Sequence, residues 1–204
     1  MQKLSEIVKS GRYGELVSLS AFLTWSRDDD YYQADAWRGK WATEGGGVLI
    51  NQAVHLLDLC DWLGGGIAAL RCDISTKTLH IEVEDTADAV FWMKNGARGI
   101  FYATNANSVN NPFRLELCFQ NGIFRYADGM LAQISDGRVD VLASDTQPEQ
   151  GKAYWGSSHA RVISDFYQGK EYLRLEDALH SARVLFAMYQ SAKKHRRIEL
   201  EETI

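Results

Sequence analysis

The 204-residue chain has little of what marks linkers and membrane spans. It contains only two prolines, Pro112 and Pro148, and no low-complexity stretch that would separate two domains. No apolar run approaches the roughly 20 residues that a membrane-spanning helix needs. We therefore expect a single domain over residues 1–204 and no membrane partner.

Cysteine is scarce as well. Cys60, Cys72 and Cys118 stand apart in apolar surroundings, and none belongs to a Cys-x-x-Cys pair. We therefore expect no thiolate zinc site and no other metal site. An odd number of cysteines without a signal peptide is typical of the reducing cytoplasm, where we place the protein.

Basic clusters and phosphate-binding loops are also missing. The net charge is about −5, and the one basic run, over residues 193–197, fits a solvated helix end better than a nucleic-acid surface. No Gly-x-Gly-x-x-Gly follows a strand, and no Walker lysine follows Gly45-Gly46-Gly47. The chain therefore offers no recognisable place for a dinucleotide.

What the sequence does contain is a strand-rich pattern. Strands are predicted over residues 15–25, 67–80, 85–95, 97–104, 113–120 and 123–126, with two short strands up to residue 143 and an edge strand at 198–200. Hairpin dipeptides stand at residues 95–96, 121–122, 128–129 and 136–137, since Gly, Asn and Asp tolerate positive φ. This spacing predicts an antiparallel meander.

Helices complete the predicted fold. They are expected over residues 2–10, 45–63, 157–169 and 176–195, with Gly11 as the C-cap of the first helix and Ser157 or Ser158 as the N-cap of the third. The polar, aromatic stretch 27–44 is expected to be a functional loop. A large, predominantly antiparallel sheet with helices on one face is an α+β fold. Its open face needs cover, so we expect a homodimer or tetramer. Apolar side chains for that face are Phe91, Met93, Ile100, Tyr102, Phe119 and Phe124.

The predicted helix over residues 45–63 carries the candidate chemistry. It is apolar almost all round, as expected of a buried helix, but Asn51, His55 and Asp58 are spaced i, i+4, i+7 and fall on one stripe. In one interpretation the stripe faces a polar ligand, with His55 moving a proton and Asn51 binding the same hydroxyl. In the other it is a satisfied core network without a ligand. Asp58 could orient the imidazole or contact a neighbouring strand.

At this helix the sequence resembles the C-terminal domain of the glucose–fructose oxidoreductase/inositol dehydrogenase/MocA family. The family pattern is a Trp-Arg element, a short spacer and GGGxLxDxGxHxxDxxxxL. Here Trp37-Arg38 precedes the stretch from Gly45 to Asp58. The resemblance continues at residues 84–87, 95–97, 156–166 and 196–200, so it covers nearly the whole chain.

The resemblance implies an NAD(P)-dependent oxidoreductase that acts on a CH–OH group of a sugar, polyol or sugar derivative. In the family, an N-terminal Rossmann domain binds NAD or NADP and supplies a lysine, while the C-terminal domain supplies an Asp and a His four residues apart. Asn51 and His55 match these two positions. Because an amide cannot be a general base, the resemblance implies that Asn51 positions the substrate and that His55 or the lysine carries the proton.

The resemblance also implies contacts around the substrate. Arg38 and Trp37 match the Trp-Arg element, although a structural salt bridge is an equal alternative for Arg38, and His159 matches a position near the mouth of the cleft. No Rossmann segment stands within residues 1–204, so we expect this chain to be inactive without one. A non-catalytic oligomerisation or sugar-binding module is the alternative function.

Overall fold

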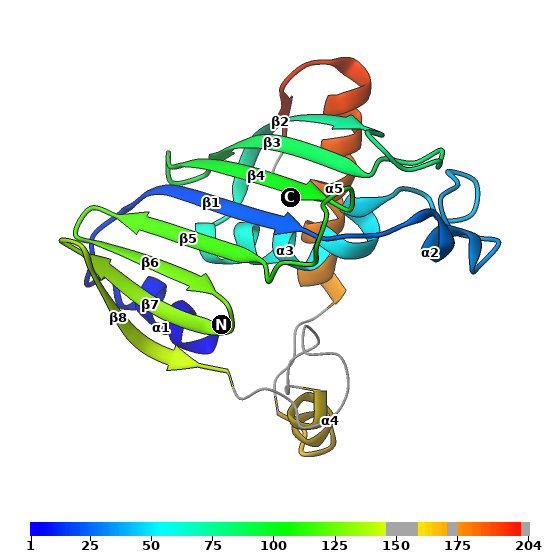
Figure 1. Ribbon diagram of the computed structural model, residues 1–204. Coiled ribbons are helices and arrows are strands. Elements are labelled where there is room, and N and C mark those ends of the chain that lie inside the picture. The colour runs from blue at the N-terminus through cyan, green and yellow to red at the C-terminus, as the bar shows by residue number, and fades with distance from the viewer. Residues whose placement is uncertain (146–158, 171–174, 201–204) are drawn as a thin grey trace.

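The computed structural model describes residues 1–145, 159–170 and 175–200. Within this part the chain forms one nine-stranded sheet with the order β8-β7-β6-β5-β1-β4-β3-β2-β9 (Figure 1). The strands are β1 (Leu16–Thr24), β2 (Ile67–Ser75), β3 (Thr86–Met93), β4 (Arg98–Thr104), β5 (Arg114–Phe119), β6 (Gly122–Ala127), β7 (Met130–Ser135), β8 (Arg138–Ser144) and β9 (Ile198–Glu199). Only β1 and β4 run parallel among these neighbours, so the predicted, mostly antiparallel sheet is confirmed.

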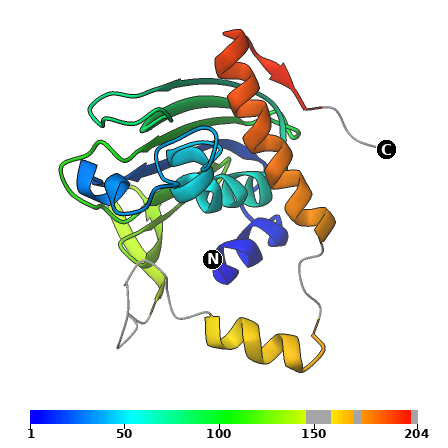
Figure 2. The same ribbon diagram turned by 90° about the vertical axis from the view of Figure 1, so that its right-hand side faces the viewer.

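The helical elements accompany one face of this sheet. They are α1 (Gln2–Ser10), α2 (Asp29–Gln33), the π-helical turn η1 (Leu49–Ala53), α3 (Val54–Gly64), α4 (His159–Tyr167) and α5 (Leu175–Lys194). Figure 2 shows α1, α3 and α5 on the same side of the sheet, whereas α4 lies away from it. No helix in the described part is long and apolar enough to cross a membrane.

The core lies between the sheet and α3 and α5, and strand register decides which side chains enter it. Phe101 of β4 is fully buried because its neighbours across the sheet, Ala21 on β1 and Ala89 on β3, are small. Phe91 of β3 lies opposite Gly99, where a side chain would crowd its ring. Small residues beside each phenylalanine therefore let the aromatic rings fill the helix side of the sheet.

The prediction for the open face is wrong for four of its six side chains. Phe91, Met93, Phe119 and Phe124 are buried on the helix side, in the core. Ile100 is 55% exposed and Tyr102 is half-buried, so both remain on the open face. Side chains along a strand alternate between the two faces of a sheet. Whether the odd-numbered or the even-numbered residues face the helices depends on the register between strands, which the sequence pattern does not give.

Several boundaries also differ from the predictions. Strand β2 ends at Ser75 instead of residue 80, because the backbone then turns to donate three N–H groups to the Asp85 carboxylate. The predicted loop 27–44 contains α2, which begins after Asp28, whose carboxylate accepts from the Tyr31 N–H. The predicted N-caps at residues 157–158 lie outside the described residues.

The turns agree better with the sequence. Gly96, Gly129 and Gly137 all have positive φ between antiparallel strands, as expected for hairpin glycines. Gly11 ends α1 in the left-handed conformation with φ of 63°, which confirms the predicted C-cap. The positive φ of these glycines was therefore predictable from the sequence.

Adjacent residues on β4 give a test of which side chains face the core. Phe101→Ala should lower the free energy of unfolding by about 3–5 kcal/mol, because it empties a fully buried site. Ile100→Ala, one residue earlier on the open face, should change it by no more than about 0.5 kcal/mol in the monomer. Urea unfolding at low protein concentration measures both, and equal losses would contradict the register.

Candidate functional site

The glycine run at residues 45–47, just before η1, lets its main chain pack directly against the main chain at Glu84. A side chain at Gly47 would overlap the carbonyl oxygen of Glu84, and one at Gly46 would overlap the hydroxyl of Tyr189. Glycine is therefore required by close packing at these two positions, and the helix begins at residues 48–49 instead of residue 45 as predicted.

The buried Glu84 carboxylate holds the start of this helix. It accepts from the N–H groups of Gly47 (2.9 Å) and Leu49 (3.1 Å) and from the hydroxyl of Tyr189 (2.8 Å). The N–H of Val48 donates to the Glu84 carbonyl oxygen at 3.0 Å. Glu84 is only 2% exposed, and this burial raises its pKa, although the three hydrogen bonds oppose the shift.

These contacts show whether the glycine run fits a dinucleotide. A pyrophosphate binds at a helix start through free backbone N–H groups. Here the first N–H groups, those of residues 47, 48 and 49, already donate to the carboxylate and carbonyl oxygens of Glu84. The glycine run of this chain therefore does not fit the phosphates of NAD or NADP.

Asn51 lies in the π-helical turn and is half-buried. Its side-chain Nδ2 donates to Glu44 Oε1 at 2.6 Å, and the other carboxylate oxygen of Glu44 accepts from the N–H of Gly39 at 2.6 Å. Glu44 thus joins the turn that carries Asn51 to the loop that follows Trp37 and Arg38. Single π-helical turns inside helices are often found at functional sites.

A second polar network holds the same turn from the sheet side. Gln52 is buried, and its Oε1 accepts from Asn105 Nδ2 at 2.9 Å, while Asn105 also donates to the Tyr32 hydroxyl at 3.0 Å. Burial raises the pKa of Tyr32 to about 12, so its hydroxyl stays neutral. The turn is therefore fixed on both sides of Asn51.

His55 and Asp58 do not continue a buried stripe, so the prediction of a helix buried all round is wrong. His55 is exposed on the outer side of α3, as is Trp62 two turns later. Asp58 is half-buried and accepts from the Ser181 hydroxyl of α5, which links two helices instead of helix and strand. This contact favours a structural role for Asp58 and leaves the His55 imidazole accessible.

The Trp-Arg element forms its own cluster. Arg38 pairs with Asp35 at 2.9 Å, and its guanidinium lies 4.0 Å from the ring centroid of Tyr31. The ion pair is the structural alternative that the sequence left open for Arg38. Trp37 is 44% exposed and offers a large apolar surface beside it. His159 begins α4, and its side chain lies outside the described part of the chain.

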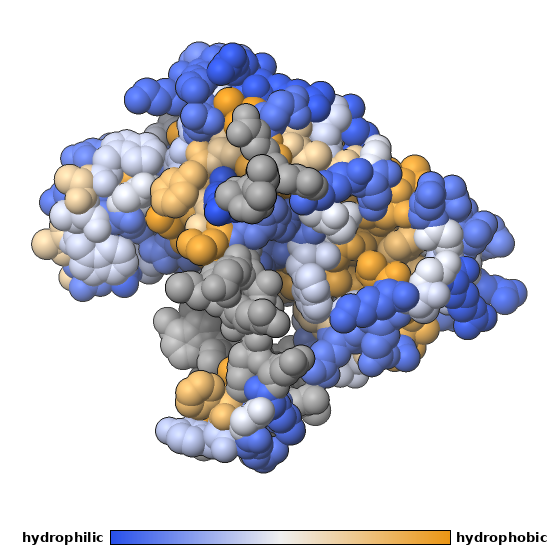
Figure 3. All heavy atoms as spheres, turned by 180° about the vertical axis from the view of Figure 1, so that it is seen from behind, coloured by the Kyte–Doolittle hydropathy of each residue, from blue (hydrophilic) through white to orange (hydrophobic). Residues whose placement is uncertain are grey.

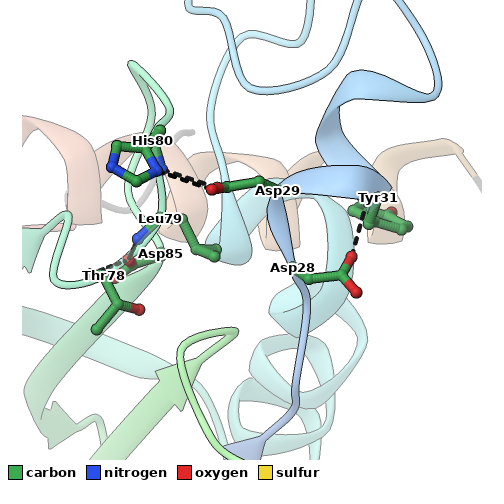
Figure 4. A network of polar contacts seen from close by, with 7 residues as sticks. All are labelled: Asp28, Asp29, Tyr31, Thr78, Leu79, His80 and Asp85. Atoms are coloured by element: carbon green, nitrogen blue, oxygen red, sulfur yellow. Dashed lines mark hydrogen bonds and ion pairs between the residues drawn. The ribbon is translucent and has the colours of Figure 1, made fainter.

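A pocket of about 510 Å³ lies between this cluster and the loop after β2, and Arg38, Lys40 and Glu82 are among its lining residues. Its rim holds a His80–Asp29 pair with 2.7 Å between His80 Nδ1 and Asp29 Oδ2 (Figure 4). The hydrogen bond to the Asp29 carboxylate raises the pKa of His80, and His80 in turn lowers the pKa of Asp29. Arg38 is the predicted site residue that lines this pocket; Asn51 and His55 do not line it.

Sequence reasoning missed four residues that build the site: Glu44, Glu84, Asn105 and Tyr189. Glu84 belongs to a motif that was interpreted only as the beginning of a strand, and Glu44 directly precedes the glycine run. The glycines at residues 45–47 have no side chain that could cap the helix that follows them, which is a signal that another group must accept from its first N–H groups. Asn105 and Tyr189 contact the site from distant segments, and nothing in the local pattern marks them.

The buried carboxylate gives a prediction about pH. Because the pKa of Glu84 is raised, its contribution to stability is present below the unfolded-state value, about 4.3, and is lost as the pH rises through the folded-state pKa. Glutamine does not titrate and resembles the protonated acid in shape. The stability of Glu84→Gln relative to the unsubstituted chain should therefore improve as the pH rises from about 4 to about 8, measured by urea unfolding.

Tyr189→Phe serves as the matched variant for this experiment. It removes one hydrogen bond that stabilises the ionised carboxylate, so the total loss of stability between about pH 4 and about pH 8 should become larger than in the unsubstituted chain. The opposite slope for Glu84→Gln would mean that the three hydrogen bonds outweigh burial.

Comparison with solved structures places this geometry among known proteins. The WlbA dehydrogenase from Bordetella pertussis, solved with NADH and UDP-GlcNAcA, has 26% sequence identity and a TM-score of 0.78 over 99% of this chain and 60% of that chain. WlbA from Chromobacterium violaceum, solved with the same two ligands, has 26% identity and a TM-score of 0.81 over 100% of this chain and 60% of that chain.

An NAD binding oxidoreductase from Klebsiella pneumoniae shares the fold at 19% identity, with a TM-score of 0.82 over 99% of this chain and 63% of that chain. No curated protein matches the chain. The chain spans about 60% of the length of the two WlbA relatives. Residues 1–125, more than half of the chain, match the GFO/IDH/MocA C-terminal domain, so the chain belongs to this domain family.

Proposed function

We propose that this chain is the substrate-binding part of a nicotinamide-dependent oxidoreductase that acts on a CH–OH group of a sugar, polyol or sugar derivative. The observation that carries the proposal is the pairing of a fixed Asn51 with an accessible His55 on the helix where the family has its Asp and His. The two relatives solved with NADH and UDP-GlcNAcA support a nicotinamide cofactor and a sugar-type substrate.

The roles of the residues follow from their chemistry. A nicotinamide cofactor, when bound beside this site, would supply the hydride chemistry at the substrate carbon. Asn51 hydrogen-bonds the substrate hydroxyl, and the imidazole of His55, which has a nitrogen that can donate or accept a proton, exchanges the hydroxyl proton. Trp37, Arg38 and His159 are proposed to contact the rest of the substrate. Asp58 is proposed to hold α3 in position and not to contact the substrate, because its carboxylate accepts from the Ser181 hydroxyl of α5.

A further domain is needed to complete this site. The glycine run does not fit a dinucleotide, so NAD or NADP is proposed to bind mainly to a Rossmann domain that these residues do not include, and the chain alone is proposed to be inactive. The helix side keeps exposed apolar side chains, including Trp62 on α3 (49%) and Phe186 on α5 (64%). Apolar atoms also gather in a hollow over the β5–β8 side of that face (Figure 3), which supports cover by another domain.

The catalytic assignment is tested by His55→Ala in a protein that joins this chain to a dinucleotide-binding domain. Turnover should fall by about 10²-fold or more, because general acid–base catalysis contributes about that much. The assay follows NADH or NADPH absorbance with UDP-sugars, free sugars and polyols as substrates. His195→Ala, an exposed histidine that pairs with Asp73 of β2 and does not line the pocket, is the control and should keep its turnover.

The same assay separates the alternative function. If no substrate is oxidised or reduced while the 204-residue chain alone binds sugars in calorimetry, the chain is a sugar-binding module. Near-unchanged turnover of His55→Ala would remove His55 from the mechanism but leave the oxidoreductase in place.

The open face of the sheet is proposed to form a homodimer or tetramer interface. Ile100 lies there between half-buried Val90, on the neighbouring strand β3, and Tyr102, two residues further along β4. Trp92 on the same face is flanked by the guanidinium groups of Arg98 (4.1 Å) and Arg197 (4.3 Å). An apolar centre with arginines and aromatic rings beside it has the composition of a protein interface.

The oligomer is tested by light scattering. The chain should be at least dimeric, and Ile100→Lys should shift it toward monomer because it places a charge in the apolar centre of the interface. Lys3→Ala, on the exposed side of α1, should leave the mass unchanged. A monomeric mass for the unsubstituted chain at high concentration would contradict the interface.

A further inference from the structure

The amide of Asn51 has a defined orientation. An ionised carboxylate only accepts hydrogen bonds, so the Asn51 atom 2.6 Å from Glu44 Oε1 is Nδ2, which donates. An amide turned the other way would bring two acceptor oxygens together. The Oδ1 atom of Asn51 is therefore directed away from Glu44.

Glu44 is itself held in place. Its second oxygen accepts from the N–H of Gly39 at 2.6 Å, and the carbonyl of Gly39 accepts from the N–H of Glu82 at 2.8 Å. Gly39 has φ of +73° and packs against Ile81, so its backbone is fixed by the neighbouring loop. Both carboxylate oxygens thus have N–H donors on defined segments, and hydrogen bonds to a charged group are the stronger kind.

The contact supplies a carboxylate at the place where the sequence lacks one. Position 51 holds an amide where the family pattern has Asp, and the carboxylate group shown to contact it comes from residue 44, seven positions earlier. A negative charge on the donor side of an amide polarises it and makes its oxygen a better acceptor. The amide oxygen still cannot take a proton, unlike the oxygen of an aspartate.

We propose that Glu44 is a positioning residue that orients Asn51, so that Oδ1 accepts the hydrogen bond of the substrate hydroxyl, and that Glu44 and Asn51 together replace the single aspartate of the family. This inference rests on the proposed function. It deepens that function, because proton exchange with the hydroxyl is then left to His55 or to a group from outside this chain, while Glu44 and Asn51 bind and orient.

The orientation is tested without any activity, by NMR of the 204-residue chain labelled with ¹⁵N. The side-chain NH₂ signals of Asn51 should shift when acid protonates Glu44, and this shift should be lost in Glu44→Gln. Glu82→Gln, which changes a nearby carboxylate that accepts from the Trp41 N–H, is the control and should keep the shift. If the Asn51 side-chain signals change neither on acidification nor in Glu44→Gln, the proposal is overturned, whether or not the protein is an oxidoreductase.

The role in catalysis is tested by exchanging the two groups, in a protein that also carries a dinucleotide-binding domain. Asn51→Asp alone places two carboxylates at hydrogen-bond distance, so turnover at about pH 8 should fall at least about tenfold. The double variant Asn51→Asp, Glu44→Gln restores one carboxylate and one amide, and turnover should recover to within about threefold of the starting protein. The carboxylate introduced at position 51 can also take a proton, so the pH–rate profile should gain activity on its acid side.

Thermal unfolding of the same variants identifies a purely structural role. If the double variant regains stability but not turnover, Glu44 only holds the loop, and the proposal is overturned. If Asn51→Asp alone matches or exceeds the starting protein in turnover, Glu44 does not supply the missing carboxylate, and the proposal is again overturned. If the unsubstituted protein turns over no substrate, the proposed function fails, and the NMR result decides the orientation of Asn51.

Discussion

The geometry of the candidate site depends on one buried carboxylate, that of Glu84. Burying a carboxylate is costly, and two backbone N–H groups and the Tyr189 hydroxyl offset part of that cost here. Since those N–H groups belong to the first residues of a helix, the charge also interacts favourably with the positive end of the helix dipole. The contact between Glu84 and the N–H groups of Gly47 and Leu49 therefore sets the position at which the helix that carries Asn51 and His55 begins.

The neighbouring residue Asp85 fixes the opposite wall of the site. Its fully buried carboxylate accepts from the N–H groups of Lys77, Thr78 and Leu79 and from the Thr86 hydroxyl (Figure 4 shows part of this network). The loop it anchors then reaches Gly39 and lines the pocket beside Arg38. Two consecutive acidic residues at the start of β3 therefore position the helix on one side and the pocket wall on the other.

The features of the fold that depend on neighbouring residues could be predicted from the sequence. Those that depend on contacts between distant residues could not. Strands, hairpin glycines and the Gly11 cap depend on alternation and positive φ, which neighbouring residues set. The start of the central helix depends on a contact between residues 47 and 84, and the faces of β3 and β5 depend on register. The apolar pattern of residues 45–63 predicted a buried helix and gave no sign that the side carrying His55 is exposed.

The proposed site consists of one fixed residue and one accessible residue, and the difference agrees with their proposed chemistry. In the proposed role, Asn51 must present the oxygen of its amide to the substrate, and its hydrogen bond to Glu44 fixes the amide in that orientation. A histidine that exchanges protons needs a route to solvent or to another group, and His55 is exposed. An isolated domain with a finished active site would enclose both. In this chain only Asn51 is held in place, whereas His55 is exposed. In the proposed arrangement, a second domain that covers α3 would bring the cofactor to the side of the helix that carries His55.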